Sequence, residues 1–191
     1  MKKLLLGLVL LFACTGMFFV QPQVNAHAKA VEPRILIAYF SLSGNTRLIA
    51  QDIQGMIGGD LFEIKAERAY GPDFDSAVEQ AREELRINAR PKLTAKVENM
   101  RDYDVIFVGF PNWVGTMPMA VFSFLEQYDF SGKTLIPFCT HGTSGVSDTI
   151  TDFKKLNPQA TILEYIDFFR NDVGDAEIPL QNWLKKLGFL K

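Results

Sequence analysis

The sequence predicts an α/β domain built on a doubly wound, five-stranded parallel sheet. Continuous apolar runs alternate with helical patterns along the chain, and several of the runs suit strands that are buried on both faces. Hydrophobic residues make up 48% of the 191 residues, which is enough for a sizeable core in one domain. Because strands and helices alternate, right-handed crossovers are expected to place helices on both faces of the sheet.

The expected elements cover the domain from residue 35 to the end of the chain. The apolar runs predict strands over residues 35–40, 61–66, 105–109, 134–139 and 160–168. Helical patterns occupy residues 46–57, 74–88, 121–128, 146–156 and 177–187. In sheets of this kind, ligands bind beyond the carboxyl ends of the strands, where the strand order reverses. The segments after Phe40, Gly109 and Cys139 are therefore expected to meet in one crevice.

Residues 1–26 have the pattern of an N-terminal signal peptide. Two lysines precede a strongly apolar run, and small residues suited to cleavage stand around Ala26. Residues 27–33 are then expected to be a linker, and residues 34–191 the folded domain. Cleavage would leave a protein that is secreted or held in the periplasm or cell envelope.

Two other fates of this leader stay open. The apolar run could persist as an uncleaved membrane anchor. Alternatively, the segment Leu11-Phe12-Ala13-Cys14 resembles a lipobox and could direct lipid attachment to Cys14. Either fate would keep the protein associated with a membrane.

The charge balance argues against a nucleic-acid partner. The net charge is −2, and without the two leader lysines the 20 basic residues fall to 18, against 22 acidic ones. No metal site and no catalytic residue is predicted. After cleavage the only thiol is that of Cys139, which is expected to be a small buried side chain at a strand end and not a nucleophile.

Residues 41–46 connect the first apolar run to the first helix and contain three hydroxyls and a glycine. A helix N-terminus presents free N–H groups and favours negative charge, so this loop predicts a phosphate site. The loop lacks the Gly-Lys-Ser/Thr of triphosphate sites and the Gly-x-Gly-x-x-Gly of dinucleotide sites. The alternative is that these residues only cap a helix.

The other two loops offer an aromatic ring and a polar backbone. Trp113 stands in a loop stiffened by prolines, where it could stack on a planar heterocycle or fold back onto its own domain. The loop after Cys139 has two glycines and three hydroxyls, which suit the polar edge of a ring system or a helix cap. His141 could be a general acid or base near a redox centre, or an ordinary hydrogen-bond donor.

Together, the three loops resemble the flavodoxin family. The motifs are Ser-Leu-Ser-Gly-Asn-Thr after the first strand, Pro-Asn-Trp-Val-Gly-Thr-Met-Pro after the third and Thr-His-Gly-Thr-Ser-Gly after the fourth. The likeness runs from about residue 34 to the C-terminus and is to flavodoxin-like proteins with a Thr-His-Gly-x-Ser-Gly loop. It implies the strand order 2-1-3-4-5 and the cofactor FMN.

The resemblance also implies which residues bind FMN. The terminal phosphate would lie against Ser41, Leu42, Ser43, Gly44, Asn45 and Thr46. The isoalloxazine ring would lie beside Pro111, Asn112, Trp113, Gly115 and Thr116, with the third loop supplying Thr140, His141, Gly142 and Gly145. Trp113 would stack on the ring, and the peptide at Gly115 would change orientation on reduction. The third loop lacks the second aromatic residue that many flavodoxins have.

The function that follows from the resemblance is an exported FMN protein that carries electrons by reversible flavin reduction. Its partners would be a redox protein or a small electron acceptor. Two alternatives stay open. One is an NAD(P)H-dependent FMN reductase that acts on a quinone or another small acceptor, and the other is a binding module that holds no flavin.

Overall fold

The computed structural model describes residues 32–191 apart from Pro72. These residues form one compact unit, Glu32–Lys191. The predicted signal peptide and most of the predicted linker lie outside the described residues, so both stay predictions. Within the described part of the chain, none of the helices combines the length and the hydropathy that crossing a membrane requires.

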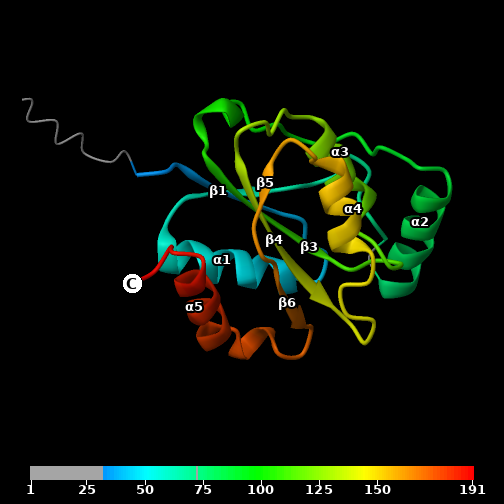
Figure 1. Cartoon of the computed structure of the whole chain (residues 1–191). Helices are drawn as coiled ribbons and strands as arrows, with labels where there is room; N and C mark the ends of the chain where they lie inside the picture. Colours follow the sequence, from blue (N-terminus) through cyan, green and yellow to red (C-terminus); the bar gives the residue numbers. More distant parts are fainter. Residues whose placement is uncertain (1–31, 72) are drawn as a thin grey trace, which may run out of the picture. The chain divides into compact units, whose positions relative to one another are not determined.

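The strands of the described chain are parallel and form one sheet (Figure 1). Its order is β2-β1-β3-β4-β5, which confirms the predicted doubly wound sheet, and β6 also pairs with β4. In the centre of the sheet, Tyr39 lies opposite Gly109, which in turn lies opposite Phe138. The strands are β1 Ile35–Tyr39, β2 Asp60–Glu63, β3 Val105–Pro111, β4 Thr134–His141, β5 Thr161–Ile162 and β6 Ile166–Phe169.

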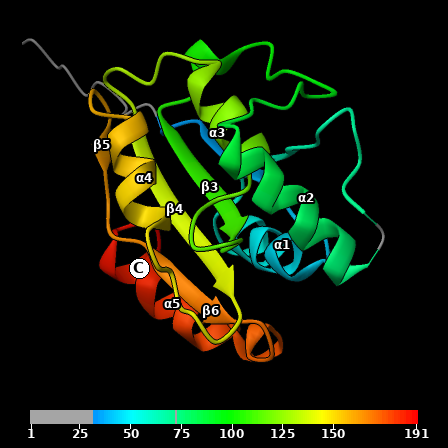
Figure 2. The ribbon, with the colours of Figure 1, turned by 90° about the vertical axis from the view of Figure 1, so that its right-hand side faces the viewer.

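Helices cover both faces of this sheet, as Figures 1 and 2 show. Helices α1 and α5 lie on one face, and α2, α3 and α4 lie on the other. The helices are α1 Asn45–Ile57, α2 Phe74–Arg86, α3 Met119–Glu126, α4 Thr149–Leu156 and α5 Glu177–Lys186, with short 3₁₀ turns η1 Met100–Asp102 and η2 Val173–Asp175. The alternation of strands and helices that the sequence predicted is therefore confirmed.

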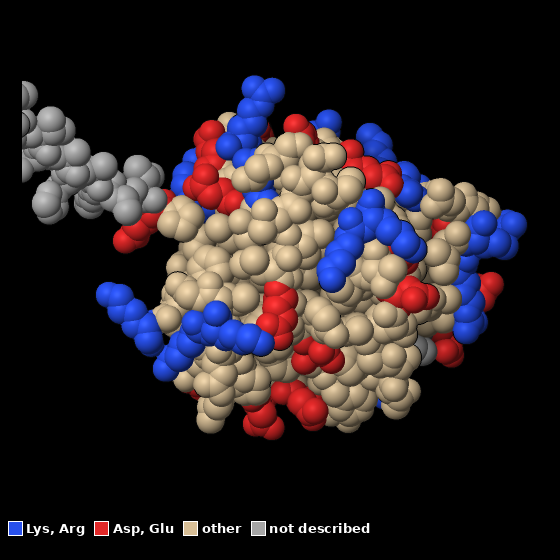
Figure 3. Space-filling view, viewed as in Figure 1, with Lys and Arg blue, Asp and Glu red and all other residues tan. Residues whose placement is uncertain are grey.

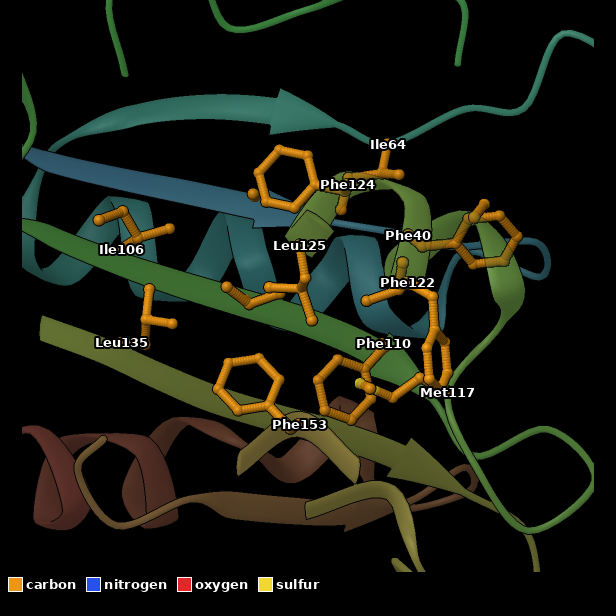
Figure 4. Packing of buried hydrophobic residues seen from close by; sticks show 14 of the residues in the cluster. Phe40, Ile64, Ile106, Phe110, Met117, Phe122, Phe124, Leu125, Leu135 and Phe153 are labelled. Carbon is orange, nitrogen blue, oxygen red and sulfur yellow. The ribbon is translucent and has the colours of Figure 1, made fainter. Parts of the chain in front are cut away.

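The core has two layers because successive residues of a strand point to opposite faces of the sheet. On the α2, α3 and α4 side, Ile106 packs in the cluster that includes Phe153 (Figure 4). On the α1 and α5 side, the neighbouring strand residue Phe107 meets Trp183 edge to face, with ring centroids 5.8 Å apart. Close-packed side chains thus cover the central strands on both faces, so the sheet is a rigid base for the loops at its edge.

The prediction of a single strand over residues 160–168 is wrong. Two short strands, β5 and β6, follow one another there. Both pair with β4, first at Thr134 and Leu135 and again from Phe138. Pro137 lies between the two pairings and has no N–H to give to the neighbouring strand. Three residues, 163–165, separate β5 from β6, whereas only two residues of β4 lie between the corresponding partners. The chain therefore bulges between β5 and β6.

The second strand is shorter than the predicted range of residues 61–66. It ends at Glu63, opposite Tyr39, which is the last residue of β1. The Ile64 N–H still donates to Tyr39 O at 2.7 Å, and further along the chain Ala66 forms an isolated antiparallel bridge with Leu93.

Charged side chains are dispersed over the face shown in Figure 3. Lys and Arg side chains and Asp and Glu side chains both lie around a broad uncharged area, and neither sign gathers into a continuous stripe on this face.

Candidate functional site

Three loops at the carboxyl ends of neighbouring strands meet around a cavity of about 520 Å³. We call residues 41–46, after β1, the first loop. Residues 111–118, at the end of β3, are the second loop, and residues 140–148, at the end of β4, are the third loop. Because β1, β3 and β4 are adjacent and parallel, their carboxyl ends open at one edge of the sheet. The predicted convergence of the three loops in one crevice is confirmed.

Ten of the fifteen predicted site residues line this cavity. Ser43 and Trp113 are both among them, so the hydroxyl-rich loop and the aromatic loop face the same space. That these residues bind a cofactor stays a prediction. The ten are Leu42, Ser43, Asn45, Thr46, Pro111, Asn112, Trp113, Thr140, His141 and Gly142.

The other five predicted residues shape the loops and are not among the lining residues. In the first loop, the Gly44 N–H donates to Ser41 Oγ at 3.1 Å. In the second loop, the buried Thr116 hydroxyl donates to Asp152 Oδ2 at 2.7 Å. The five are Ser41, Gly44, Gly115, Thr116 and Gly145.

The first loop leads into α1 without a side-chain cap. Gly44 is the residue before the helix and has a φ of 96°, a left-handed conformation that glycine adopts easily. Among the described residues, no side chain accepts a hydrogen bond from the first N–H groups of α1, so side-chain capping does not explain the loop. The N–H groups at this end are available to an anion beside Ser43 and Asn45.

Buried hydroxyls join the first loop to the third. Thr46 Oγ1 and Thr140 Oγ1 lie 2.8 Å apart, and both residues are buried. In the next residue of α1, the Arg47 guanidinium pairs with Glu63 at the end of β2. Burial tends to raise the pKa of Glu63, but hydrogen bonds from Lys65 and Arg47 outweigh burial, and the pKa lies below its ordinary value.

Trp113 both packs against the domain and lines the cavity. Its ring meets those of Phe40 and Tyr70 edge to face, with centroids 5.2 Å and 5.0 Å away. Tyr70 is itself fixed, because its hydroxyl donates to Glu84 at 2.8 Å and burial raises its pKa well above the ordinary range. Trp113 therefore packs on its own domain, as one of the two alternatives held, and because the side chain is half-buried and borders the open space, stacking on a planar ring stays a prediction.

The backbone after Trp113 turns back sharply. The N–H of Trp113 donates to Thr116 O at 2.8 Å, and the N–H of Thr116 donates back at 3.1 Å. Between them, Val114 has a φ of 55° and Gly115 a φ of 87°. Positive φ at both central residues is typical of a type I′ turn, and it is strained for a β-branched residue such as Val114.

The second and third loops are joined by hydrogen bonds. The Asp148 N–H donates to Gly115 O at 3.0 Å, and the Asn112 amide donates to Gly145 O and, at 3.2 Å, to Ser147 Oγ. The buried Oδ1 of Asn112 has no hydrogen-bond partner among the described residues. It is an unsatisfied acceptor in a residue that lines the cavity.

His141 is the last residue of β4, and its side chain is 11% exposed. Its Nε2 lies 2.8 Å from Asp167 Oδ2 on β6, and its Nδ1 lies 2.6 Å from Gly142 O. The neighbouring Cys139 is fully buried, as predicted, and burial raises the pKa of its thiol to about 12. Cys139 is therefore a neutral packing residue at physiological pH.

Seven lining residues were missed by sequence reasoning. Val78 and Arg82 belong to α2, whose charged pattern indicated only a solvated helix. Arg170 follows β6 directly, and the rule that ligands bind beyond strand ends would have found it had the fifth strand been extended by one residue. The seven are Ala77, Val78, Arg82, Val114, Thr143, Ser144 and Arg170.

Comparison with known proteins places the chain in a family. A family model described as flavodoxin matches residues 34–187. A flavodoxin from Picosynechococcus sp. is 29% identical over 124 residues, which cover 62% of this chain. The match spans 58% of that flavodoxin, less than two thirds of its length.

Solved structures agree with this match. A candidate flavoprotein from Bacteroides eggerthii is 30% identical, with a TM-score of 0.71, and the alignment covers 82% of this chain and 98% of that one. A flavoprotein from Lactobacillus acidophilus, solved in complex with FMN, has the same fold with 21% identity and a TM-score of 0.64, covering 75% and 97% of the two chains. The chain belongs to the flavodoxin family.

Proposed function

We propose that this protein binds FMN in the cavity between the three loops and carries electrons through it. The observation that carries the proposal is the convergence of Ser43, Trp113 and His141 on one space of about 520 Å³. That volume lies within the range of roughly 300–1,000 Å³ typical of small-molecule sites. Membership of the flavodoxin family and the fold shared with the FMN complex support the same conclusion.

The first loop fits the terminal phosphate of FMN. Ser43, Asn45 and Thr46 line the cavity at the start of α1, where uncapped N–H groups and the helix dipole favour an anion. Gly44 has open space where a Cβ would be, so the backbone can approach the phosphate closely. The loop contains no lysine, and backbone amides and hydroxyls would hold the phosphate.

The second and third loops fit the flavin ring. Trp113 offers an aromatic surface that Phe40 and Tyr70 hold in place, and a stacked ring would bury much of its own face there. The unpaired Oδ1 of Asn112 is suited to an N–H group of the polar edge of the ring. Bound FMN would supply reversible two-electron chemistry, while this chain binds it, orients it and limits the access of water.

Titration of the full chain with FMN and with riboflavin tests this proposal. We expect FMN to bind with quenching of its fluorescence, and riboflavin to bind more weakly because it lacks the phosphate. Absence of a flavin absorbance band after reconstitution would favour the alternative of a binding module without flavin. Equal affinity for the two ligands would show that the phosphate assignment is wrong.

The alternative of an NAD(P)H-dependent reductase rests on Arg82 and Arg170. Both are exposed arginines that line the cavity, and they could meet the phosphates of a nicotinamide nucleotide. Anaerobic stopped-flow mixing of the FMN-loaded protein with NADH and NADPH separates the two functions. A carrier should be reduced slowly or not at all, and rapid direct reduction of the flavin would favour the reductase.

The proposal includes export of the protein. The apolar leader with its two preceding lysines supports a cleaved signal peptide, with an uncleaved anchor and lipid attachment at Cys14 as the alternatives. Cell fractionation followed by mass measurement of the intact protein distinguishes them. A mature chain starting near residue 27 supports cleavage, a chain starting at Cys14 with added lipid supports the lipoprotein, and a full-length cytoplasmic chain would contradict export.

A further inference from the structure

Both ring nitrogens of His141 face hydrogen-bond acceptors. Nδ1 lies 2.6 Å from the carbonyl oxygen of Gly142, and Nε2 lies 2.8 Å from the carboxylate of Asp167. A carbonyl oxygen and an ionised carboxylate can only accept. A neutral imidazole carries one N–H and can satisfy only one of these partners, whereas an imidazolium satisfies both.

The carboxylate of Asp167 is available as an ionised partner. Its side chain is 40% exposed, so water as well as His141 can solvate the negative charge. The His141 ring is only 11% exposed and has its two nitrogens engaged, so neither is free to exchange a proton with a ligand in this arrangement. The geometry therefore favours a fixed cation at His141 and not the general acid or base considered from the sequence.

The ion pair is oriented with its positive end toward the cavity. His141 lines the cavity, whereas Asp167 lies outside it and lines a second hollow of about 350 Å³ together with Asp172 and Asp175. Arg82 and Arg170 are further positive groups on the cavity side. The buried Cys139 thiol beside the pair is neutral, since its pKa lies near 12. Among the described residues that line the cavity, the charged groups are thus positive.

Resting on the proposed function, we propose that His141, held doubly protonated by Asp167, tunes the flavin toward its reduced form. Two-electron reduction with uptake of one proton from water adds one negative charge to a flavin. A cation at the wall of the cavity attracts that charge, so the protein binds the reduced cofactor more tightly than the oxidised one. Asp167 is the positioning residue, because it acts only through the imidazolium.

Two neutral variants test this inference, His141→Gln and Asp167→Asn, each in the full chain loaded with FMN. With dithionite as the electron donor, we expect each variant to shift the two-electron midpoint potential downward by about 30 mV, which corresponds to a tenfold loss in the ratio of reduced to oxidised affinity. The affinity for oxidised FMN should change much less. Asp172→Asn removes a nearby acid that has no hydrogen bond to His141 among the described residues, and it should not lower the potential.

Nitrogen NMR of the FMN-free protein supplies a second readout. The chain has two histidines, His27 and His141, so His27→Gln assigns the signals. At pH 7 we expect both ring nitrogens of His141 to carry protons, and the Asp167→Asn variant to lose one of them. A singly protonated ring in the parent protein, or unchanged potentials in both variants, would overturn the inference. Failure of the parent protein to bind FMN would overturn the proposed function, while the NMR result would still decide whether the cavity presents a cation.

Discussion

The first loop lines the same cavity as the second and third loops, yet the two regions are held in different ways. In the first loop, Ser43 and Asn45 line the cavity, and no side chain of residues 32–71 or 73–191 caps the following helix. In the other region, polar groups are mostly used within the protein, as where Asn112 bonds to Gly145 and Thr116 to Asp152. Within the described chain, the first N–H groups of α1 therefore have no side-chain partner, whereas hydrogen bonds tie the second and third loops into a preorganised wall.

Under the proposed function, this contrast would give the two regions different tasks. An anion needs unused donors, and the start of α1 supplies them. A flat ring needs rigid surface, and the perpendicular packing of Trp113 against Phe40 and Tyr70 supplies it. Strain at Val114, with a φ of 55°, is consistent with a turn shaped for binding at some cost in stability.

Trp113→Ala should give the largest effect on binding. We expect FMN and riboflavin to bind about 10- to 100-fold more weakly, or about 1–3 kcal/mol, because both ligands lose the same aromatic surface. Fluorescence titration measures the two affinities. Trp183→Phe is the matched control, since Trp183 belongs to α5 and packs in the core, and it should leave both affinities unchanged. A loss confined to FMN would place the ring elsewhere.

Ser43→Ala should reveal the opposite pattern with a smaller effect. We expect FMN to bind about fivefold more weakly, or about 1 kcal/mol, because one hydrogen bond to the phosphate is lost, and riboflavin to bind as before. Ser131→Ala, at an exposed serine in the turn before β4, is the control. Equal weakening of both ligands would break the division between the two regions.

Thr46→Ala is a less selective probe of the same loop. It should weaken FMN binding and also lower the free energy of unfolding by about 1 kcal/mol, because the buried Thr140 hydroxyl loses its partner at 2.8 Å. Urea unfolding without ligand measures this second effect. An unchanged unfolding free energy would show that water or Thr140 itself compensates for the lost hydroxyl.

Glycine-to-alanine changes compare the backbones of the two regions directly. Gly44 and Gly115 have φ values of 96° and 87°, and nothing lies within 4 Å of where a Cβ would be at either. Each change should therefore cost about 1 kcal/mol of unfolding free energy through backbone conformation alone.

Val114→Gly should be neutral or stabilising, because it relieves a positive φ at an exposed residue. Destabilisation by Val114→Gly would show that the valine side chain supports the turn.

The sequence was sufficient for the fold and for the meeting of the loops. Apolar runs such as residues 105–109 identified central strands, and the rule that ligands bind beyond strand ends brought Ser43 and Trp113 together. The break between β5 and β6 was not foreseen, because its cause, Pro137, lies in the neighbouring strand. Local patterns do not show which strand will lack a hydrogen-bond partner.

The cavity wall contributed by α2 could not be foreseen either. Val78 and Arg82 carry no motif, and only the packing of α2 beside the second loop brings them to the cavity. The pairing of His141 with Asp167 has the same origin, since the two residues are 26 positions apart and meet only because β6 pairs with β4. A side-chain pair that forms between adjacent strands can thus be identified only once the register of those strands is known.

The ionic anchor of the first loop should give the smallest effect. The pKa of Glu63 lies below its ordinary value of 4.5, so its pairing with Arg47 adds stability above that pH, and this is lost as pH falls through the lowered pKa. We expect Glu63→Gln to lose less than about 1 kcal/mol at pH 7, and the difference from the parent protein to shrink by pH 3. Urea unfolding at the two pH values measures this difference.

Glu67→Gln, which removes a more exposed pair with Lys92, is the control and should change stability less at pH 7. If Glu63→Gln also weakened FMN more than riboflavin, the ion pair would be holding the start of α1 in its phosphate-binding position, and the first loop would need an anchor much as the other two loops do.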